Sequence, residues 1–178
     1  MRHASRVIVA AGLGALLLAG CGRREAPPVA PPPYTPPRVE VAPLSPGDYV
    51  ATASSIDLLV IRASKLAEGG AQGDRVRGIA STLLADHEGV SAQLSFAGRR
   101  LNLLPSASLM PRHQAMLAEL GAALDFDAAY KRIMIAVHEQ AVRVHGDFAL
   151  AGTSPTLRPV AEIALPAMRR HLDQLRGL

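Results

Sequence analysis

The sequence predicts an all-α protein, an antiparallel four-helix bundle, and three observations support this. Apolar residues make up 49% of the 178 residues but aromatic residues only 3%, so the core must consist of Ala, Leu, Val, Ile and Met, which favours packed helices over sheets. From residue 45 onward, apolar residues recur at spacings of three and four, as on a helix face. Glycines and prolines divide this region into four long helical segments and one short one.

Residues 1–20 have the features of a lipoprotein signal peptide. Arg2 and Arg6 precede an apolar stretch, residues 7–19, which is too short to span a bilayer but has the length of a signal core. The stretch ends in Leu-Ala-Gly-Cys at residues 18–21, which resembles the bacterial lipoprotein cleavage box. Cys21 is the single cysteine of the chain, and we expect it to carry the lipid. An ordinary secretory signal with an incidental cysteine is the alternative.

Residues 21–44 predict a lipidated cysteine followed by a proline-rich periplasmic tether. Gly22 rather than Asp follows the cysteine, which by resemblance to the usual sorting rule indicates the periplasmic face of the outer membrane. Several acyl chains would hold the protein firmly there, whereas one chain binds only marginally. Seven prolines between residues 27 and 37 favour polyproline II. Fully extended at about 3.1 Å per residue, the tether would reach on the order of 70 Å.

Charge and cysteine content exclude several classes of function. The formal net charge of the chain is +4, but residues 45–178 carry 14 basic and 13 acidic side chains. Nucleic acid is therefore not an expected partner, and the stacking aromatic residues of single-strand binders are nearly absent as well. A single cysteine excludes an intrachain disulfide framework and an all-cysteine zinc site.

The folded domain, residues 45–178, is expected to begin with a helical hairpin. Ser45 is placed as an N-cap, Pro46 as the first helical residue and Asp48 in the first turn. This helix should run to about Glu68 and end at the glycines 69–70. Asp74 can cap the second helix. Its apolar stripe is Val76, Ala80, Leu83, His87, Val90 and Leu94.

A second hairpin should follow a longer crossing connection. Residues 98–106 predict a loop, and Ser108 and Pro111 should open a short helix that ends near Gly121. The third long helix is expected from about Asp125 to Ala149, and residues 154–155, Ser-Pro, should open the fourth, which the interior Pro166 should kink. Two hairpins joined by a long connection are typical of ferritin-like bundles.

Several short motifs along residues 48–178 resemble one bacterial family, the domain-of-unknown-function 4142 family. The resemblance implies a ferritin-like bundle and a location in the cell envelope, and it implies no established activity. The chain departs from the family pattern in the first helix, where Val60 or Arg62 stands at a position that is often acidic. The matching motifs are Asp86-His87, His113-Gln114-Ala115-Met116-Leu117, Phe126-Asp127 with Tyr130, His138-Glu139, and Leu165-Pro166 with His171-Leu172.

Four polar residues on the inward stripes predict a layer inside the bundle. Counted from the two hairpin turns at about 1.5 Å per residue, Asp57 and His87 should share a level. His138 should lie at a similar depth, and His171 roughly one turn deeper. Two histidines and one carboxylate suit a mononuclear divalent metal, and Asp57, His87, His138 and His171 are the candidate ligands.

The same residues also fit a purely structural polar network. In that interpretation a buried histidine donates to Asp57 and accepts a hydrogen bond from Ser64 or another hydroxyl, and no cofactor is needed. Di-iron chemistry is disfavoured because the chain contains no Glu-x-x-His. His113 and His145 are expected at the surface or at hairpin ends, and Asp86 in solvent.

Two functions therefore remain open. The first is a non-enzymatic envelope lipoprotein, anchored through its N-terminus, whose helical domain binds another envelope protein or contributes to stress tolerance. The second is a periplasmic metal-binding or metal-dependent redox protein. No catalytic residue is assigned, because the chain has no Gly-x-Ser-x-Gly or His-Glu-x-x-His pattern and its one cysteine is expected to be acylated.

Overall fold

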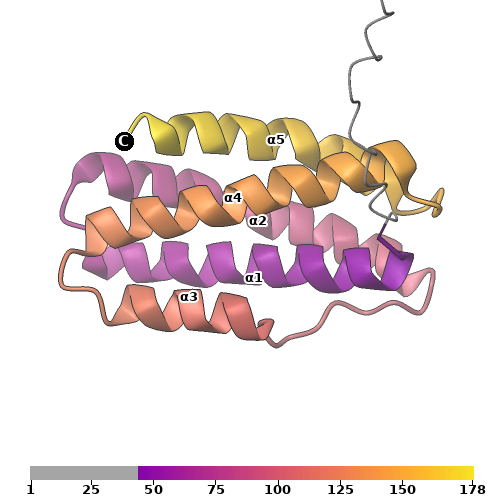
Figure 1. Cartoon of the computed structure of the whole chain (residues 1–178), viewed down its shortest axis with the longest axis horizontal. Helices are drawn as coiled ribbons and strands as arrows, with labels where there is room; N and C mark the ends of the chain where they lie inside the picture. The colour runs from indigo at the N-terminus through magenta and orange to yellow at the C-terminus, as the bar shows by residue number, and fades with distance from the viewer. Residues whose placement is uncertain (1–43) are drawn as a thin grey trace, which may run out of the picture. The chain divides into compact units, whose positions relative to one another are not determined.

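A computed structural model describes residues 44–178 of the chain (Figure 1). These residues belong to one compact unit. The predicted signal peptide, the lipidated Cys21 and the proline-rich tether lie outside the described residues and stay predictions.

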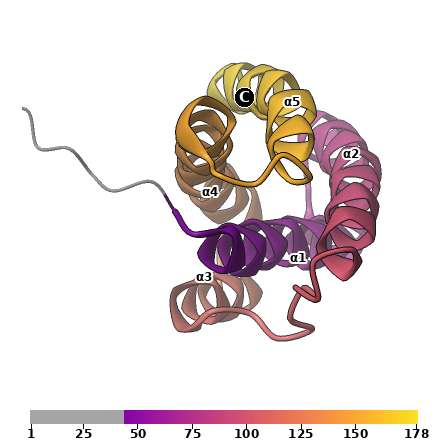
Figure 2. The same ribbon diagram turned by 90° about the vertical axis from the view of Figure 1, so that its right-hand side faces the viewer.

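The described part of the chain is all-helical, as predicted, and contains no strand. Helices α1, α2, α4 and α5 surround a common core, and the short α3 lies on the outer side of α1 (Figures 1 and 2). Each long helix contacts its hairpin partner, and α1 also contacts α4 while α2 contacts α5. The bounds are Pro46–Gly70 for α1, Asp74–Arg99 for α2, Pro111–Gly121 for α3, Phe126–Ala151 for α4 and Arg158–Arg176 for α5.

The helix starts follow capping chemistry, with one displaced start that matters for the site. The hydroxyl of Ser45 accepts the Asp48 N–H at 3.1 Å and caps α1 as predicted. Asp125 caps α4 in the same way. The fourth long helix, however, begins at Arg158 rather than at residues 154–155. Ser154 instead forms a turn in which its carbonyl accepts the N–H groups of Leu157 and Arg158.

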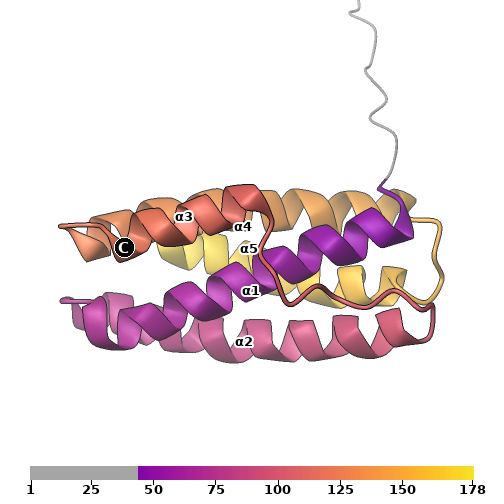
Figure 3. The same ribbon diagram turned by 90° about the horizontal axis from the view of Figure 1, so that it is seen from below.

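A long connection joins the two hairpins and is fixed at both of its ends. It leaves α2 at one end of the bundle and runs along the bundle toward α3 (Figure 3). At its start Gly98 is required, because a Cβ there would lie 2.2 Å from the carbonyl oxygen of Leu103. At its far end the carboxylate of Asp127 accepts the N–H groups of Gln72 at 3.0 Å and Gly73 at 2.7 Å, which holds the α1–α2 turn.

His113 fastens α3 to the bundle, which corrects the expectation that this residue lies at the surface. Its ring is 1% exposed. Nδ1 lies 2.7 Å from the Ser55 hydroxyl on α1, and Nε2 lies 3.1 Å from Oε1 of Gln140 on α4. The Ser55 hydroxyl also accepts the Met110 N–H at 2.8 Å. The surface was predicted because nothing local to α3 indicates which of its faces packs against α1.

The core follows the predicted stripes. All six stripe residues of α2 are buried, including His87. Helix α1 is buried on several faces because α2, α3 and α4 all contact it, so it carries polar residues inside the bundle as well as apolar ones. Pro166 lies inside α5 as expected. Between residues 44 and 178, no helix combines the length and hydropathy needed to cross a bilayer.

Candidate metal centre

The four predicted layer residues lie at matching positions along their helices. In the first hairpin, Asp57 lies a certain number of residues before Gly70, which is the last residue of α1. His87 lies the same number of residues after Asp74, which is the first residue of α2. In the second hairpin, His138 and His171 stand at this same interval from the end of α4 and from the start of α5. At about 1.5 Å per residue, all four lie about 20 Å from a helix end, near the middle of the bundle.

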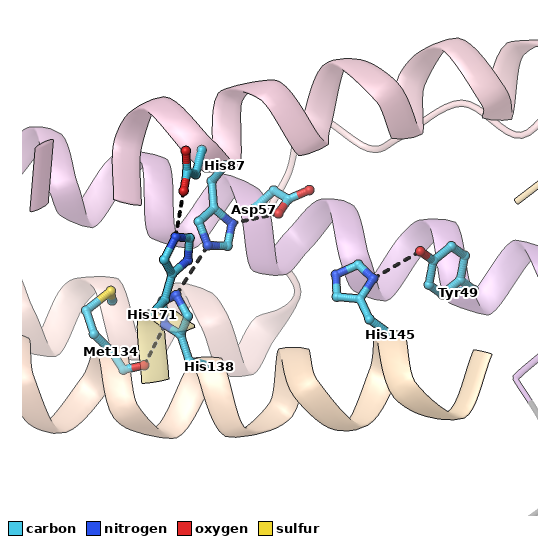
Figure 4. Close-up of polar contacts among 8 residues, drawn as sticks. Tyr49, Asp57, His87, Met134, His138, His145 and His171 are labelled. Carbon is cyan, nitrogen blue, oxygen red and sulfur yellow. Dashed lines mark hydrogen bonds and ion pairs between the residues drawn. The ribbon is translucent and has the colours of Figure 1, made fainter. Parts of the chain in front are cut away.

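Three of them form a compact group of histidines. His87, His138 and His171 each place one ring nitrogen within 4.8 Å of those of the other two. The first two residues are 0% exposed and the third is 1% exposed. Nε2 of His87 lies 3.2 Å from Nε2 of His138. We call these three residues the tri-histidine centre (Figure 4).

Each ring of the tri-histidine centre is held at its other nitrogen by an oxygen atom. Nδ1 of His87 lies 2.8 Å from Oδ1 of Asp57, and Nδ1 of His138 lies 2.8 Å from the Met134 carbonyl oxygen. Nε2 of His171 lies 2.8 Å from Oδ2 of Asp86. This pattern leaves one nitrogen of each ring for another partner, and it is the arrangement that orients histidine ligands at metal sites.

The outer partners determine where the protons lie. The Met134 carbonyl can only accept, so Nδ1 of a neutral His138 donates and its Nε2 carries a lone pair. By the same reasoning His171 donates to the Asp86 carboxylate, and its Nδ1 carries a lone pair. His87 can donate from Nε2 only when its Nδ1 accepts a hydrogen bond from a protonated Asp57 carboxyl group. Within the described residues Nδ1 of His171 is buried and has no hydrogen-bond partner.

Burial keeps all three rings neutral. Desolvation, followed by the charge of His171, lowers the pKa of His87 to about 3. Desolvation also lowers the pKa of His138, with His87 as the next cause, and lowers that of His171, where Asp86 partly offsets it. Burial raises the pKa of Asp57 to about 8. Neutral imidazole is the form that binds metal ions, so no ring has to lose a positive charge, but the Asp57–His87 pair must release one proton before Nε2 of His87 can face an ion.

The structure corrects the predicted depth of His171 and the predicted role of Ser64. His171 does not lie a turn deeper, because residues 154–157 form a turn and α5 begins only at Arg158. Ser64 does not reach the histidines, since its hydroxyl lies 3.0 Å from that of Tyr130. Asp57 lies behind His87, as the partner of its Nδ1.

Sequence reasoning missed two further residues of this interior. Asp86 was expected in solvent, but it accepts a hydrogen bond from His171 while its side chain stays 42% exposed. His145 was expected at the surface and is 0% exposed. Its Nδ1 lies 3.0 Å from the Tyr49 hydroxyl, as Figure 4 shows. The signal for His145 was its position two helical turns after His138, along the same face.

Comparisons with solved structures find the same fold in CopM. CopM in the Cu(II)-bound form matches with a TM-score of 0.66 and 16% identity, over 76% of this chain and 95% of that chain. The Cu(I)-bound form matches with a TM-score of 0.64 and 15% identity, over 75% and 94%. The apo form matches with a TM-score of 0.62 and 15% identity, over 75% and 95%. At this identity the likeness establishes the fold.

Comparison with curated proteins found no match. The model of one protein family matches residues 33–178, which includes both hairpins and α3. This agrees with the resemblance carried by the histidine motifs. The chain belongs to the family described as domain of unknown function DUF4142.

Proposed function

We propose that this protein binds one transition-metal ion at the tri-histidine centre and that copper is the preferred ion. One observation carries the proposal. Each of the three buried rings is fixed by an oxygen atom at one nitrogen, and the three rings bring ligand nitrogens within 4.8 Å of one another. Three neutral imidazoles suit copper and zinc, and Cu(II) is the stronger binder of the two in the divalent series.

A purely structural network explains these contacts less well. His138 and His171 each present a lone pair inward, and His87 can donate to only one of them. A buried acceptor without a donor costs about 1–3 kcal/mol, and within the described residues Nδ1 of His171 is such an acceptor. A cation placed between the rings would engage all three inward nitrogens at once, with the Asp57 carboxylate ionised and accepting the Nδ1 proton of His87.

The surroundings of the centre also suit a cation. Asp57 is fully buried beside His87, and when ionised its carboxylate would offset part of the charge of the ion. The solved structures with this fold point the same way, because CopM was determined with Cu(II) and with Cu(I). We therefore favour metal binding over the other function considered, a helical module that binds an envelope partner.

Metal content is the direct test. Residues 22–178, which contain the whole bundle and lack Cys21, would be produced without a His tag, exposed to copper or zinc, desalted and measured by plasma mass spectrometry. We expect about one equivalent of copper in the parent chain. An unloaded parent would refute the proposal.

Two variants can remove a ligand while keeping its outer hydrogen bond. In His171→Gln the amide nitrogen stands in for Nε2 and can still donate to Asp86, and in His138→Asn it stands in for Nδ1 and can donate to the Met134 carbonyl. Both variants should fold and lose the metal. His145→Asn is the matched control, because His145 is equally buried, lies outside the centre and makes its hydrogen bond through Nδ1, and it should load as the parent does. Loss of metal in the control alone would contradict the assignment.

We further propose that the protein works at the periplasmic face of the outer membrane, anchored through Cys21. The apolar segment, the Leu-Ala-Gly-Cys run and the proline-rich stretch support this. In a bacterial host, the parent should incorporate labelled fatty acid and fractionate with membranes. Cys21→Ser should do neither, and membrane association of that variant would refute the anchor.

A further inference from the structure

The tri-histidine centre is closed to solvent, so an ion needs a route to it. Both His87 and His138 are 0% exposed. Of the two carboxylates that hold histidine rings, Asp57 is 0% exposed, whereas the Asp86 side chain is 42% exposed. Asp86 is thus bonded to a ring of the centre at one oxygen and lies partly in solvent.

Asp86 lies on the seam between α2 and α5, and this seam is open along part of its length. Toward the C-terminal end of α2, it widens into a groove of about 710 Å³. Phe96 and Ile163 stand on its two sides and are 67% and 62% exposed. Farther along the same antiparallel pair of helices, the hydrogen bond between Asp86 and His171 closes the seam.

Helix α5 is weakened next to this closure. Pro166 lies inside α5, between the groove and His171. Proline has no N–H, so the carbonyl of Glu162 loses its usual helical donor, and the ring crowds the preceding turn. The hydrogen-bond ladder of α5 is therefore interrupted in the turn before His171.

Asp86 supplies a negative charge next to His171, against the positive charge of Arg170. Residues 169–170 are two arginines, and the charge of Arg170 acts on His171, while Asp86 acts on it in the opposite direction. Without the carboxylate, the charge of Arg170 next to His171 would not be offset by Asp86. Oppositely charged groups at an opening raise the association rate of a charged ligand.

We propose that Asp86 is the capture ligand of the centre and that the α2–α5 seam is the route of the ion. The ion first binds the exposed carboxylate of Asp86 and breaks its hydrogen bond to His171. It then moves past the His171 ring to the inward-facing nitrogens of the tri-histidine centre. This inference rests on the proposed metal-binding function. It assigns different roles to the two carboxyl groups that are hydrogen-bonded to histidine rings of the centre. Asp86 determines the association rate of the ion, and Asp57 determines its dissociation rate.

Stopped-flow kinetics of Cu(II) binding separate these roles. The chain has no Trp, so quenching of tyrosine emission reports binding by residues 22–178. Asp86→Asn and Asp57→Asn each keep an acceptor oxygen and replace a carboxyl group that can carry the negative charge by a neutral amide. We expect Asp86→Asn to lower the association rate constant about tenfold, with Asp86→Glu restoring it. Asp57→Asn should leave association within about twofold and raise the dissociation rate about tenfold or more.

The outcomes distinguish the capture role of Asp86 from the proposal that the tri-histidine centre binds a metal ion. If the parent binds Cu(II) and the association rate of Asp86→Asn is unchanged, the capture role is wrong and metal binding stands. Equal slowing in both variants would also overturn it, because a general charge effect would then suffice. If the parent binds no ion at equilibrium, both proposals fail.

Discussion

Acidification should destabilise the metal-free bundle through histidines that are neutral when buried, and His145 measures this effect most cleanly. The residue lies outside the tri-histidine centre and is 0% exposed. Burial lowers its pKa in the folded state to about 4, although the charge of Asp57 acts in the opposite direction. In the unfolded chain its pKa is about 6.5. Between about pH 6.5 and pH 4, His145 is therefore protonated in the unfolded state and neutral in the folded state.

The sign and size of the effect follow from this difference. Stability from His145 is fully present above pH 6.5 and is lost as the pH falls toward about 4. Between pH 7 and pH 5 the linkage relation gives a loss of about 2 kcal/mol for this residue. His138 and His171, whose pKa values are also lowered by burial, add losses of the same sign.

The buried pair of Asp57 and His87 should contribute little in this window. The pKa of Asp57 is raised to about 8 and that of His87 is lowered to about 3. Between about pH 4 and pH 6.5 the folded pair holds one proton, on Asp57, and the unfolded pair also holds one, on His87. Between about pH 6.5 and pH 8 only the folded pair holds it, so the pair lowers stability as the pH rises there.

Urea unfolding followed by circular dichroism at pH 7, 6 and 5, with chelator present, tests the reasoning. His145→Asn keeps an amide nitrogen in place of Nδ1 beside the Tyr49 hydroxyl but does not titrate, so it should lose about 2 kcal/mol less than the parent between pH 7 and pH 5. This difference is independent of any cost of the substitution at pH 7. An identical pH dependence in parent and variant would refute the assignment of a neutral, buried His145.

Further substitutions test the structure around the site. Gly98→Ala should lower the free energy of unfolding by about 3 kcal/mol because its Cβ would clash with the Leu103 carbonyl. At Gly89 an added Cβ would meet no described atom within 4 Å, so Gly89→Ala should raise the free energy of unfolding by up to about 1 kcal/mol. Equal urea midpoints for the two glycine variants would contradict both expectations. Asp127→Ala should cost about 2 kcal/mol by freeing two N–H groups of the α1–α2 turn, and an unchanged melting temperature would count against that. His113→Leu should cost about 2 kcal/mol and speed amide exchange throughout α3; unchanged exchange would show that another contact holds α3.

Much of the fold could be predicted from the sequence because its signals are local. The spacing of apolar residues in α2 identified all six buried stripe positions. Ser45 and Pro46 marked the start of α1, and the glycines 69–70 marked its end. These features depend on neighbours within one or two turns of helix, so a single sequence contains them.

The parts that failed depend on contacts between distant segments. The depth of His171 was wrong because Ser154 starts a turn, and α5 begins only after it, at Arg158. Asp86 lies beside a buried ring only because α5 packs against α2. The burial of His113 depends on the choice of face by α3. None of these arrangements has a counterpart in local periodicity.

The division of the ligands between the hairpins has a consequence for folding kinetics. His87 belongs to the hairpin of α1 and α2, while His138 and His171 belong to that of α4 and α5. Each hairpin is built from contacts close in sequence and can form early, but the three rings meet only after the hairpins dock. Interactions absent from the transition state slow unfolding and leave the folding rate unchanged. If the rings meet only after that state, a bound ion would prolong the lifetime of the native state without hastening its formation.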